Sequence, residues 1–126
     1  MARVTVLDAS VLIAHLDDDD ALHERASHEL ATTNGPLDAS TITLAEVLVG
    51  PARQGQLATV RSALRMLEVE ELALPPDAAE RLATLRAESG LRLPDCCVLL
   101  AAQEARAAVL TFDGRLAREA ERLGLV

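Results

Sequence analysis

The chain has 126 residues, half of them apolar, and this composition excludes an intrinsically disordered protein. No apolar run approaches the roughly 20 residues that a membrane-spanning helix requires. The net charge of −8 gives no general attraction to nucleic acid, and one Phe with no Trp or Tyr leaves no aromatic platform for stacking bases. Any role in nucleic-acid binding must therefore depend on metal and on the arginines, which make up all 12 basic residues.

We expect a single domain over residues 1–126, because a chain of this length buries about two-thirds of its unfolded surface. The N-terminus leads directly into the apolar run 4–7 without signal-peptide architecture, which predicts a cytoplasmic protein. Cys96 and Cys97 are adjacent within an apolar run. They are predicted to be core residues, not part of a disulfide framework or a zinc site.

Short apolar runs alternate with helical patterns along the chain. Strands are predicted at residues 4–7, 37–42, 69–74 and 108–112, with 125–126 as an additional edge strand. Helices are predicted at residues 11–16, 22–30, 43–53, 57–67, 78–85, 94–105 and 116–123. Gly50-Pro51 is expected to break the third of these helices, and Gly90 to end the fifth in a left-handed conformation. This alternation predicts βαβ units and a parallel sheet.

Four acidic residues, Asp8, Glu46, Asp95 and Asp113, stand at the boundaries of these elements. Asp8 and Asp113 follow predicted strands, and the functional crevice of an open α/β sheet lies outside the carboxyl ends of its strands. Asp95 follows Pro94, which is favoured at the start of a helix. The helix that it opens is apolar on every face and is therefore predicted to be buried.

Each acid taken alone also has a structural explanation. Asp8 and Asp113 could cap the helices that follow them, and Asp95 could favour the positive end of its helix dipole. Thr43-Leu-Ala-Glu46 matches a capping box. Taken together, carboxylates that converge in apolar surroundings repel one another unless protons or a cation compensate. Mg²⁺ or Mn²⁺ is the natural partner for oxygen ligands, and the sequence has no cysteine–histidine spacing for zinc.

The arrangement resembles the PIN-domain ribonucleases, particularly the toxin component of VapBC toxin–antitoxin pairs. The resemblance covers nearly the whole chain. It rests on Val-Leu-Asp8-Ala-Ser10, Thr-Leu-Ala-Glu46-Val-Leu-Val-Gly50, Leu-Pro-Asp95 and Leu-Thr111-Phe-Asp113, in that order. It implies a three-layer α/β fold in which helices flank a central, mainly parallel sheet of four to five strands.

The resemblance also implies a metal-dependent endoribonuclease that leaves a 5′-phosphate and a 3′-hydroxyl. Its acidic quartet maps onto Asp8, Glu46, Asp95 and Asp113. Asp8, Asp95 and Asp113 are then expected to bind Mg²⁺ or Mn²⁺, while Glu46 binds metal or positions the attacking water. Supporting hydroxyls match Ser10 and Thr111. Some relatives carry a further acid where this chain has Gly114 and Arg115, which leaves the number of metal ions open.

The partners that the resemblance implies are an RNA substrate, a small cognate antitoxin and a second copy of the chain in a homodimer. Arg53, Arg92 and Arg115 are candidate phosphate contacts, because they fall near the ends of elements that carry the acids. A solvated surface role is the alternative for each of the three arginines.

Other readings of the sequence fit less well. A phosphate-accepting receiver domain would require a lysine near the last strand, and a haloacid-dehalogenase-type phosphatase would require an aspartate where Ser10 stands. His15, His23 and His28 have no identifiable acid–base partner and are expected to have surface roles. The remaining alternative is a PIN-like binding module that has kept the fold and lost efficient catalysis.

Overall fold

A computed structural model of the chain describes residues 2–126, in which four parallel strands form a sheet of order β3-β2-β1-β4. The strands are β1 (Thr5–Leu7), β2 (Leu37–Ser40), β3 (Val69–Leu72) and β4 (Ala108–Leu110). The helices are α1 (Ala9–Leu16), α2 (His23–Thr32), α3 (Thr41–Arg53), α4 (Leu57–Met66), α5 (Ala78–Ser89), α6 (Leu93–Ala105) and α7 (Gly114–Arg122). The predicted α/β architecture with a parallel sheet is confirmed.

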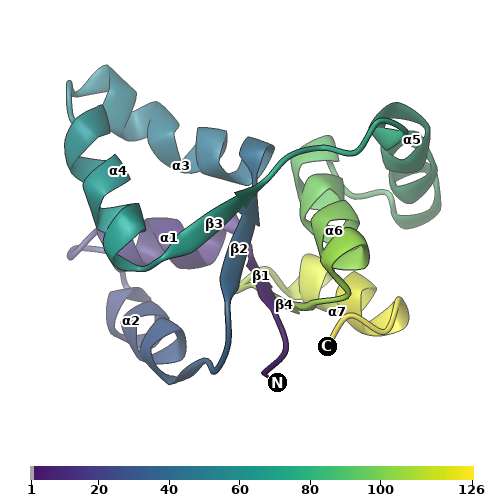
Figure 1. Cartoon of the computed structure of the whole chain (residues 1–126), viewed down its shortest axis with the longest axis horizontal. Coiled ribbons are helices and arrows are strands. Elements are labelled where there is room, and N and C mark those ends of the chain that lie inside the picture. The colour runs from purple at the N-terminus through teal and green to yellow at the C-terminus, as the bar shows by residue number, and fades with distance from the viewer. Residues whose placement is uncertain (1) are drawn as a thin grey trace.

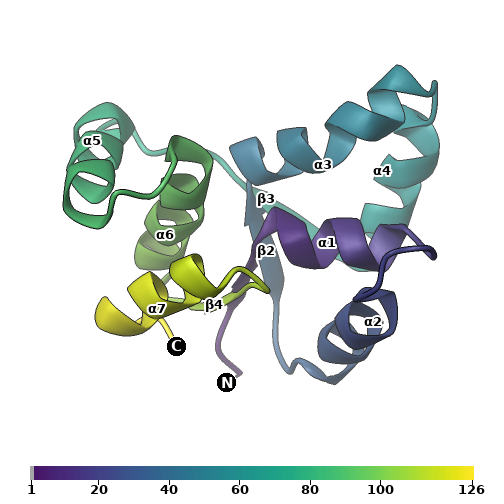
Figure 2. The same cartoon turned by 180° about the vertical axis from the view of Figure 1, so that it is seen from behind.

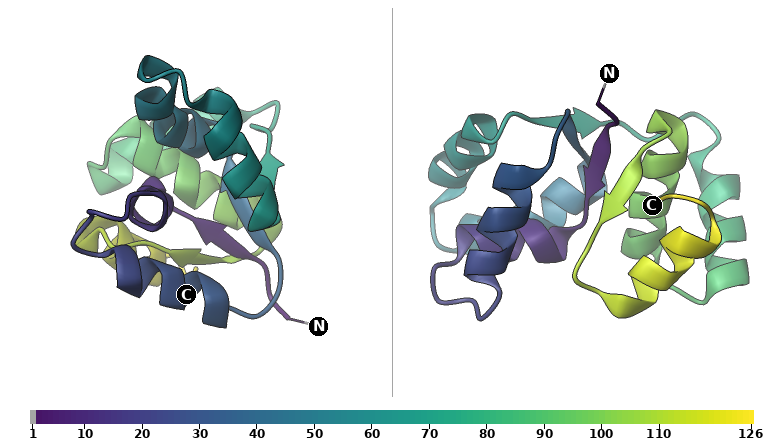
Figure 3. Two further views of the ribbon diagram at one scale, coloured as in Figure 1. Left: turned by 90° about the vertical axis from the view of Figure 1, so that its left-hand side faces the viewer. Right: turned by 90° about the horizontal axis from the view of Figure 1, so that it is seen from below.

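Two separate cores cover the two faces of the sheet. Successive side chains of a strand point to opposite faces, so Val6 packs with α5, α6 and α7 while Leu7 packs with α1 to α4. Figures 1 and 2 show the sheet between these two groups of helices, and Figure 3 shows the same division from below. The fold therefore has three layers, as the family resemblance implied.

Helix α6 is the most deeply buried helix in residues 2–126. Its residues from Cys96 to Ala102 are all buried, and it contacts strands β1, β2 and β4 as well as helices α3 and α5. This confirms the prediction of a core helix with Asp95 in its first turn. Helices α3 and α6, the longest, have 13 residues each, and no helix in the described residues is long and apolar enough to cross a bilayer.

The ends of several elements differ from the prediction. Helix α3 begins at Thr41, because the Ser40 hydroxyl accepts a hydrogen bond from the Ile42 amide and caps the helix three residues earlier than expected. The proposed capping box of Thr43 and Glu46 is therefore wrong. Helix α3 also continues through Pro51, which lies in its last turn and removes only one hydrogen bond near the end.

The expected fifth strand is absent from the described residues. The Leu125 carbonyl accepts one hydrogen bond from the Val109 amide, at 2.9 Å, while the Leu125 amide donates to Ala120, and residues 125–126 form no strand. By contrast, Gly90 adopts the predicted left-handed conformation, with φ of 73°, at the end of α5.

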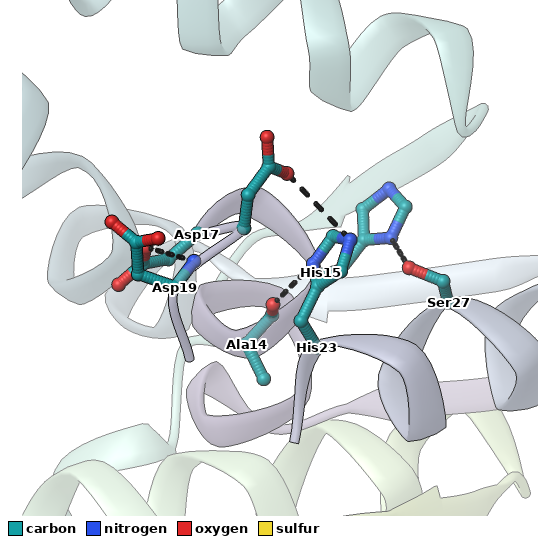
Figure 4. A network of polar contacts seen from close by, with 7 residues as sticks. Ala14, His15, Asp17, Asp19, His23 and Ser27 are labelled. Atoms are coloured by element: carbon teal, nitrogen blue, oxygen red, sulfur yellow. Dashed lines mark hydrogen bonds and ion pairs between the residues drawn. The ribbon is translucent and has the colours of Figure 1, made fainter. Parts of the chain in front are cut away.

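Two of the histidines pack together between α1 and α2 (Figure 4). The rings of His15 and His23 are stacked with centroids 6.2 Å apart. His15 Nδ1 bonds to Ser27 Oγ at 2.9 Å, and His23 Nδ1 donates to the Ala14 carbonyl at 3.0 Å. Both side chains are partly buried, so the expected surface role holds for the exposed His28 and is wrong for the stacked pair.

Candidate active site

Strand register places Asp8 and Thr111 side by side at one edge of the sheet. Leu7 of β1 pairs with Leu110 of β4, so the residues that follow them, Asp8 and Thr111, leave the sheet side by side. Asp8 also precedes α1, which starts at Ala9. Glu46 lies in the second turn of α3, and Asp95 lies in the first turn of α6.

Asp8 is buried and held by two hydroxyl groups. Ser10 Oγ and Thr111 Oγ1 each donate a hydrogen bond of 2.7 Å to Asp8 Oδ2. The same hydroxyls accept from the backbone: Phe112 N–H donates to Ser10 Oγ at 3.1 Å, and Asp113 N–H donates to Thr111 Oγ1 at 3.0 Å. These bonds fix one carboxylate oxygen. Within the described residues, Oδ1 accepts no hydrogen bond and remains available to a ligand.

The acids act on one another electrostatically. Burial, followed by the charges of Asp8 and Asp95, raises the pKa of Glu46 above its ordinary value. Burial, followed by the charges of Asp8 and Asp113, raises the pKa of Asp95 in the same way, against the opposing charge of Arg92. Such effects act over short distances, so Glu46 lies near Asp8 and Asp95, and Asp95 lies near Asp113.

The chemistry of this region fits a hard divalent cation, although no three of these carboxylates lie close enough together to coordinate one jointly. All the acids supply oxygen ligands, which Mg²⁺ and Mn²⁺ prefer. A cation would also relieve the repulsion that, after burial, raises the pKa values of Glu46 and Asp95. Within residues 2–126, however, no three His, Cys, Asp or Glu side chains lie close enough together to hold a metal ion.

The explanation of the acids as helix caps holds for some of them and fails for others. Asp113 does cap α7, because its Oδ1 accepts hydrogen bonds from the amides of Arg115 (2.9 Å) and Leu116 (3.2 Å). Asp8 precedes α1, but its carboxylate makes no hydrogen bond to that helix's amides. Glu46 has no capping role, since it lies beyond the first turn of α3. Capping therefore accounts for Asp113 and leaves Asp8 and Glu46 without a structural role of that kind.

The three predicted arginines lie at different distances from the acids. Arg92 precedes α6, and Arg115 stands in the first turn of α7; the charges of both oppose the upward shift of the Asp95 pKa. Arg53 ends α3, two turns beyond Glu46, and is not among the charges that act on Glu46 or Asp95. The structure thus brings Arg92 and Arg115 to the acids, and Arg53 stays apart.

Three features of the structure were not predicted. Arg118 and Arg122 line a hollow beside Arg115; their spacing on an amphipathic helix was a signal in the sequence. The Thr43 hydroxyl is fully buried and has no hydrogen-bond partner in residues 2–126. Asp38 is buried in β2, where burial and the charge of Glu70 on the neighbouring strand raise its pKa. No pattern in the sequence separates these last two from ordinary strand and helix residues.

Comparison with solved structures identifies several similar folds. A chain of a toxin–antitoxin complex from Klebsiella pneumoniae is 29% identical, with a TM-score of 0.74 and 86% of each chain covered. VapC20 of Mycobacterium tuberculosis, a Sarcin–Ricin loop cleaving toxin, is 17% identical with a TM-score of 0.78, covering 97% of this chain and 96% of that one. VapBC2 from Rickettsia felis, bound to a DNA fragment from its promoter, is 17% identical with a TM-score of 0.66, covering 98% and 95%.

Sequence comparison gives the family. No curated protein matches the chain. The family model of the PIN domain matches residues 5–122, which includes all four acids and every strand of the sheet. This match, together with the three-layer fold and the carboxylates at the carboxyl edge of its sheet, shows that the chain belongs to the PIN-domain family.

Proposed function

We propose that this protein is a metal-dependent endoribonuclease and the toxin of a toxin–antitoxin pair. The observation that carries the proposal is the state of Asp8: Ser10 and Thr111 hold one of its carboxylate oxygens and leave the other free, beside two acids whose pKa values are raised. Membership of the PIN-domain family and the likeness to a toxin–antitoxin chain from Klebsiella pneumoniae support it.

In this proposal Asp8, Asp95 and Asp113 hold Mg²⁺, or Mn²⁺ in its place. Bound at these acids, the cation would polarise the scissile phosphate and lower the pKa of water. The hydroxyls of Ser10 and Thr111 keep the Asp8 carboxylate in one orientation, so little conformational freedom is lost when a ligand binds.

Glu46 orients the attacking water and accepts its proton. The raised pKa of Glu46 suits this role, because a general base works best when its pKa approaches the operating pH. In the proposed mechanism Arg92 and Arg115, whose charges act on Asp95, contact the phosphate of the substrate. The water oxygen then forms the new bond to phosphorus as the bond to the 3′ oxygen breaks, and the 3′ oxygen leaves as a hydroxyl by taking a proton from solvent water.

The proposed partners are an RNA strand, a small antitoxin and a second copy of the chain. The Klebsiella pneumoniae neighbour is part of a toxin–antitoxin complex, which supports the antitoxin. The homodimer follows from the family resemblance alone. Size-exclusion chromatography with light scattering would measure the oligomeric state, and co-expression with the adjacent reading frame would test for the antitoxin.

The proposal is tested by incubating cellular RNA with the wild type, Asp8→Asn, Asp95→Asn and Asp38→Asn, with Mg²⁺ and with EDTA. Asp38→Asn is a matched control, because it also neutralises a buried aspartate but lies within β2. We expect cleavage by the wild type and the control in Mg²⁺, at least 100-fold slower cleavage by the other two variants, and none in EDTA.

Undiminished cleavage by folded Asp8→Asn would contradict the proposed mechanism. Metal binding by the wild type without any turnover of RNA would instead favour a PIN-like binding module. Calorimetry with Mn²⁺ on the same preparations separates these outcomes.

A further inference from the structure

Three arginines are among the six residues that line a small hollow along α7. Its volume is about 280 Å³, and it lies between the end of α5 and the outer face of α7. The lining residues are Ser89, Leu91, Arg115, Arg118, Glu119 and Arg122. The protein has a net charge of −8, but the three arginines give this hollow a locally positive charge.

Two of the three arginines in this hollow are unpaired. Arg122 is bound to Glu119, with Nε and Nη2 at 2.9 and 2.5 Å from Oε1. Arg115 and Arg118 form no ion pair with any residue in the range 2–126. They are three residues apart on one helix, so their like charges face the same side and repel each other. An anion between them would remove this repulsion.

Arg115 joins the hollow to the acidic site. Its side chain lines the hollow, and its backbone amide donates a hydrogen bond of 2.9 Å to Asp113 Oδ1. A strand whose scissile phosphate lies at Asp8 and Asp95 would therefore pass one of its neighbouring phosphates along α7. The carboxylates would meet the strand through a cation, and the guanidinium groups would meet it directly.

The chemistry of the lining favours phosphate over a base. A guanidinium group presents paired N–H donors that match two phosphate oxygens. The hollow has no aromatic side chain on which a base could stack, and the single Phe of the chain, Phe112, packs beneath Arg25 with 4.6 Å from the guanidinium carbon to the ring centroid. Contacts to phosphate carry affinity without reading sequence.

We propose that the arginine hollow of α7 is a phosphate subsite that holds the RNA backbone one or more nucleotides away from the cleaved bond. The proposal rests on the proposed ribonuclease function for the identity of the strand. It assigns Arg118, which the family resemblance did not indicate, as a substrate-binding residue beside Arg115.

The test compares Arg118→Gln with Arg65→Gln, a matched control that removes an exposed arginine on α4. Steady-state cleavage of a single-stranded oligoribonucleotide in Mg²⁺ gives KM and kcat. Fluorescence anisotropy in the Glu46→Gln background, at several KCl concentrations, gives the affinity for the oligoribonucleotide and its salt dependence.

We expect Arg118→Gln to raise KM about 3- to 10-fold, with kcat within about 2-fold of the wild type. The variant should also reduce the slope of log K against log salt by about 0.7, the value for one phosphate contact on a single strand. The KM and the salt slope of Arg118→Lys should lie between those of the wild type and those of Arg118→Gln, because lysine keeps the charge and loses the paired donors.

The outcomes separate this proposal from the one on which it rests. If the wild type cleaves RNA and Arg118→Gln matches it in KM and in salt slope, the subsite is wrong and the ribonuclease function stands. If the wild type does not cleave RNA, the function is wrong, and the anisotropy slopes still decide whether the hollow binds phosphate. Loss of binding to an acidic protein partner, with RNA binding unchanged, would overturn the subsite in favour of a protein interface. Circular dichroism confirms that each variant is folded.

Discussion

Thr111 and Asp8, which are 103 residues apart in the sequence, are joined by a hydrogen bond of 2.7 Å from Thr111 Oγ1 to Asp8 Oδ2. The bond links the ends of two neighbouring parallel strands, β4 and β1. The Thr111 hydroxyl also accepts the amide of Asp113, so one side chain connects two of the four acids. The geometry of the proposed site therefore depends on this threonine.

Thr111→Val should lower the cleavage rate about tenfold or more. Valine has nearly the same shape but leaves Asp8 without one of its two donors, and hydrogen bonds to charged groups are worth roughly 1.5–3 kcal/mol. Thr111→Ser keeps the hydroxyl and should retain most of the activity. Single-turnover cleavage at saturating Mg²⁺ measures the effect, and equal rates for the valine variant and the wild type would refute the role of the hydroxyl.

Without metal, Glu46 and Asp95 should make a contribution to the stability of the protein that rises as the pH falls from neutral. The pKa values of Glu46 and Asp95 are raised in the folded state by burial and by neighbouring carboxylates, above their ordinary values of 4.5 and 3.8. The folded state therefore binds more protons than the unfolded state until the pH reaches those ordinary values, and proton uptake stabilises it. Urea unfolding in EDTA between pH 7 and pH 4.5, compared with the Asp95→Asn variant, measures this contribution.

The same pKa shifts predict that metal binding weakens as the pH falls. Protons compete with the metal for Asp95, and protonation of Glu46 removes a negative charge near the bound cation. The apparent affinity for Mn²⁺ should therefore fall with decreasing pH and begin to fall above the ordinary pKa range. Calorimetric titration with Mn²⁺ at several pH values measures the affinity. An affinity that is constant down to pH 4.5 would contradict coordination by these acids.

Asp38→Asn should stabilise the protein at pH 7 by about 1 kcal/mol, or roughly 3 °C in Tm, and leave cleavage unchanged. The Asp38 carboxylate is buried, accepts no hydrogen bond from the described residues and lies in register with Glu70. Its burial and then the charge of Glu70 raise its pKa. The gain should shrink as the pH falls, because protonation neutralises the wild-type side chain as well. Thermal unfolding at pH 7 and pH 5 provides the comparison, and a lower Tm for the variant at pH 7 would count against it.

Thr43→Val should also stabilise the protein, by roughly 1 kcal/mol, because it replaces a buried hydroxyl that lacks a partner with a methyl group of similar size. Thr43→Ser keeps the hydroxyl and should give no gain. Urea unfolding of the two variants beside the wild type measures the difference. A less stable valine variant would show that the hydroxyl makes a favourable interaction, such as one with a buried water.

The stacked pair of His15 and His23 should make the protein less stable below about pH 6.5. Burial, then the charge of His23, lowers the pKa of His15 from its ordinary value of 6.5. The folded state therefore resists protonation of His15, so its contribution to stability is complete above pH 6.5 and is lost as the pH falls. His15→Gln should remove this dependence when urea midpoints at pH 7.5 and pH 5.5 are compared, and an unchanged dependence would exclude His15 as its source.

Much of the fold was predictable because it is set by local patterns. Alternating apolar runs and helical periodicities give the order of strands and helices, and the unbroken apolar run after Asp95 gives the buried helix α6. The boundaries were less predictable. Helix α3 begins at Thr41 and not at Thr43, since the choice between two capping residues depends on where β2 leaves the sheet.

The sequence by itself determined which acids stand at the ends of elements, because proline, glycine and apolar periodicity mark those ends locally. Only the tertiary structure decided what surrounds them: the hydroxyl of Thr111 on Asp8, the carboxylates acting on Asp95, and the unpaired arginines along α7. Hydrogen bonds and charge interactions act over a few ångströms between segments as much as 100 residues apart. Such distances are fixed by the register of β1 and β4 and by the packing of α6 against the sheet, and no local pattern specifies them.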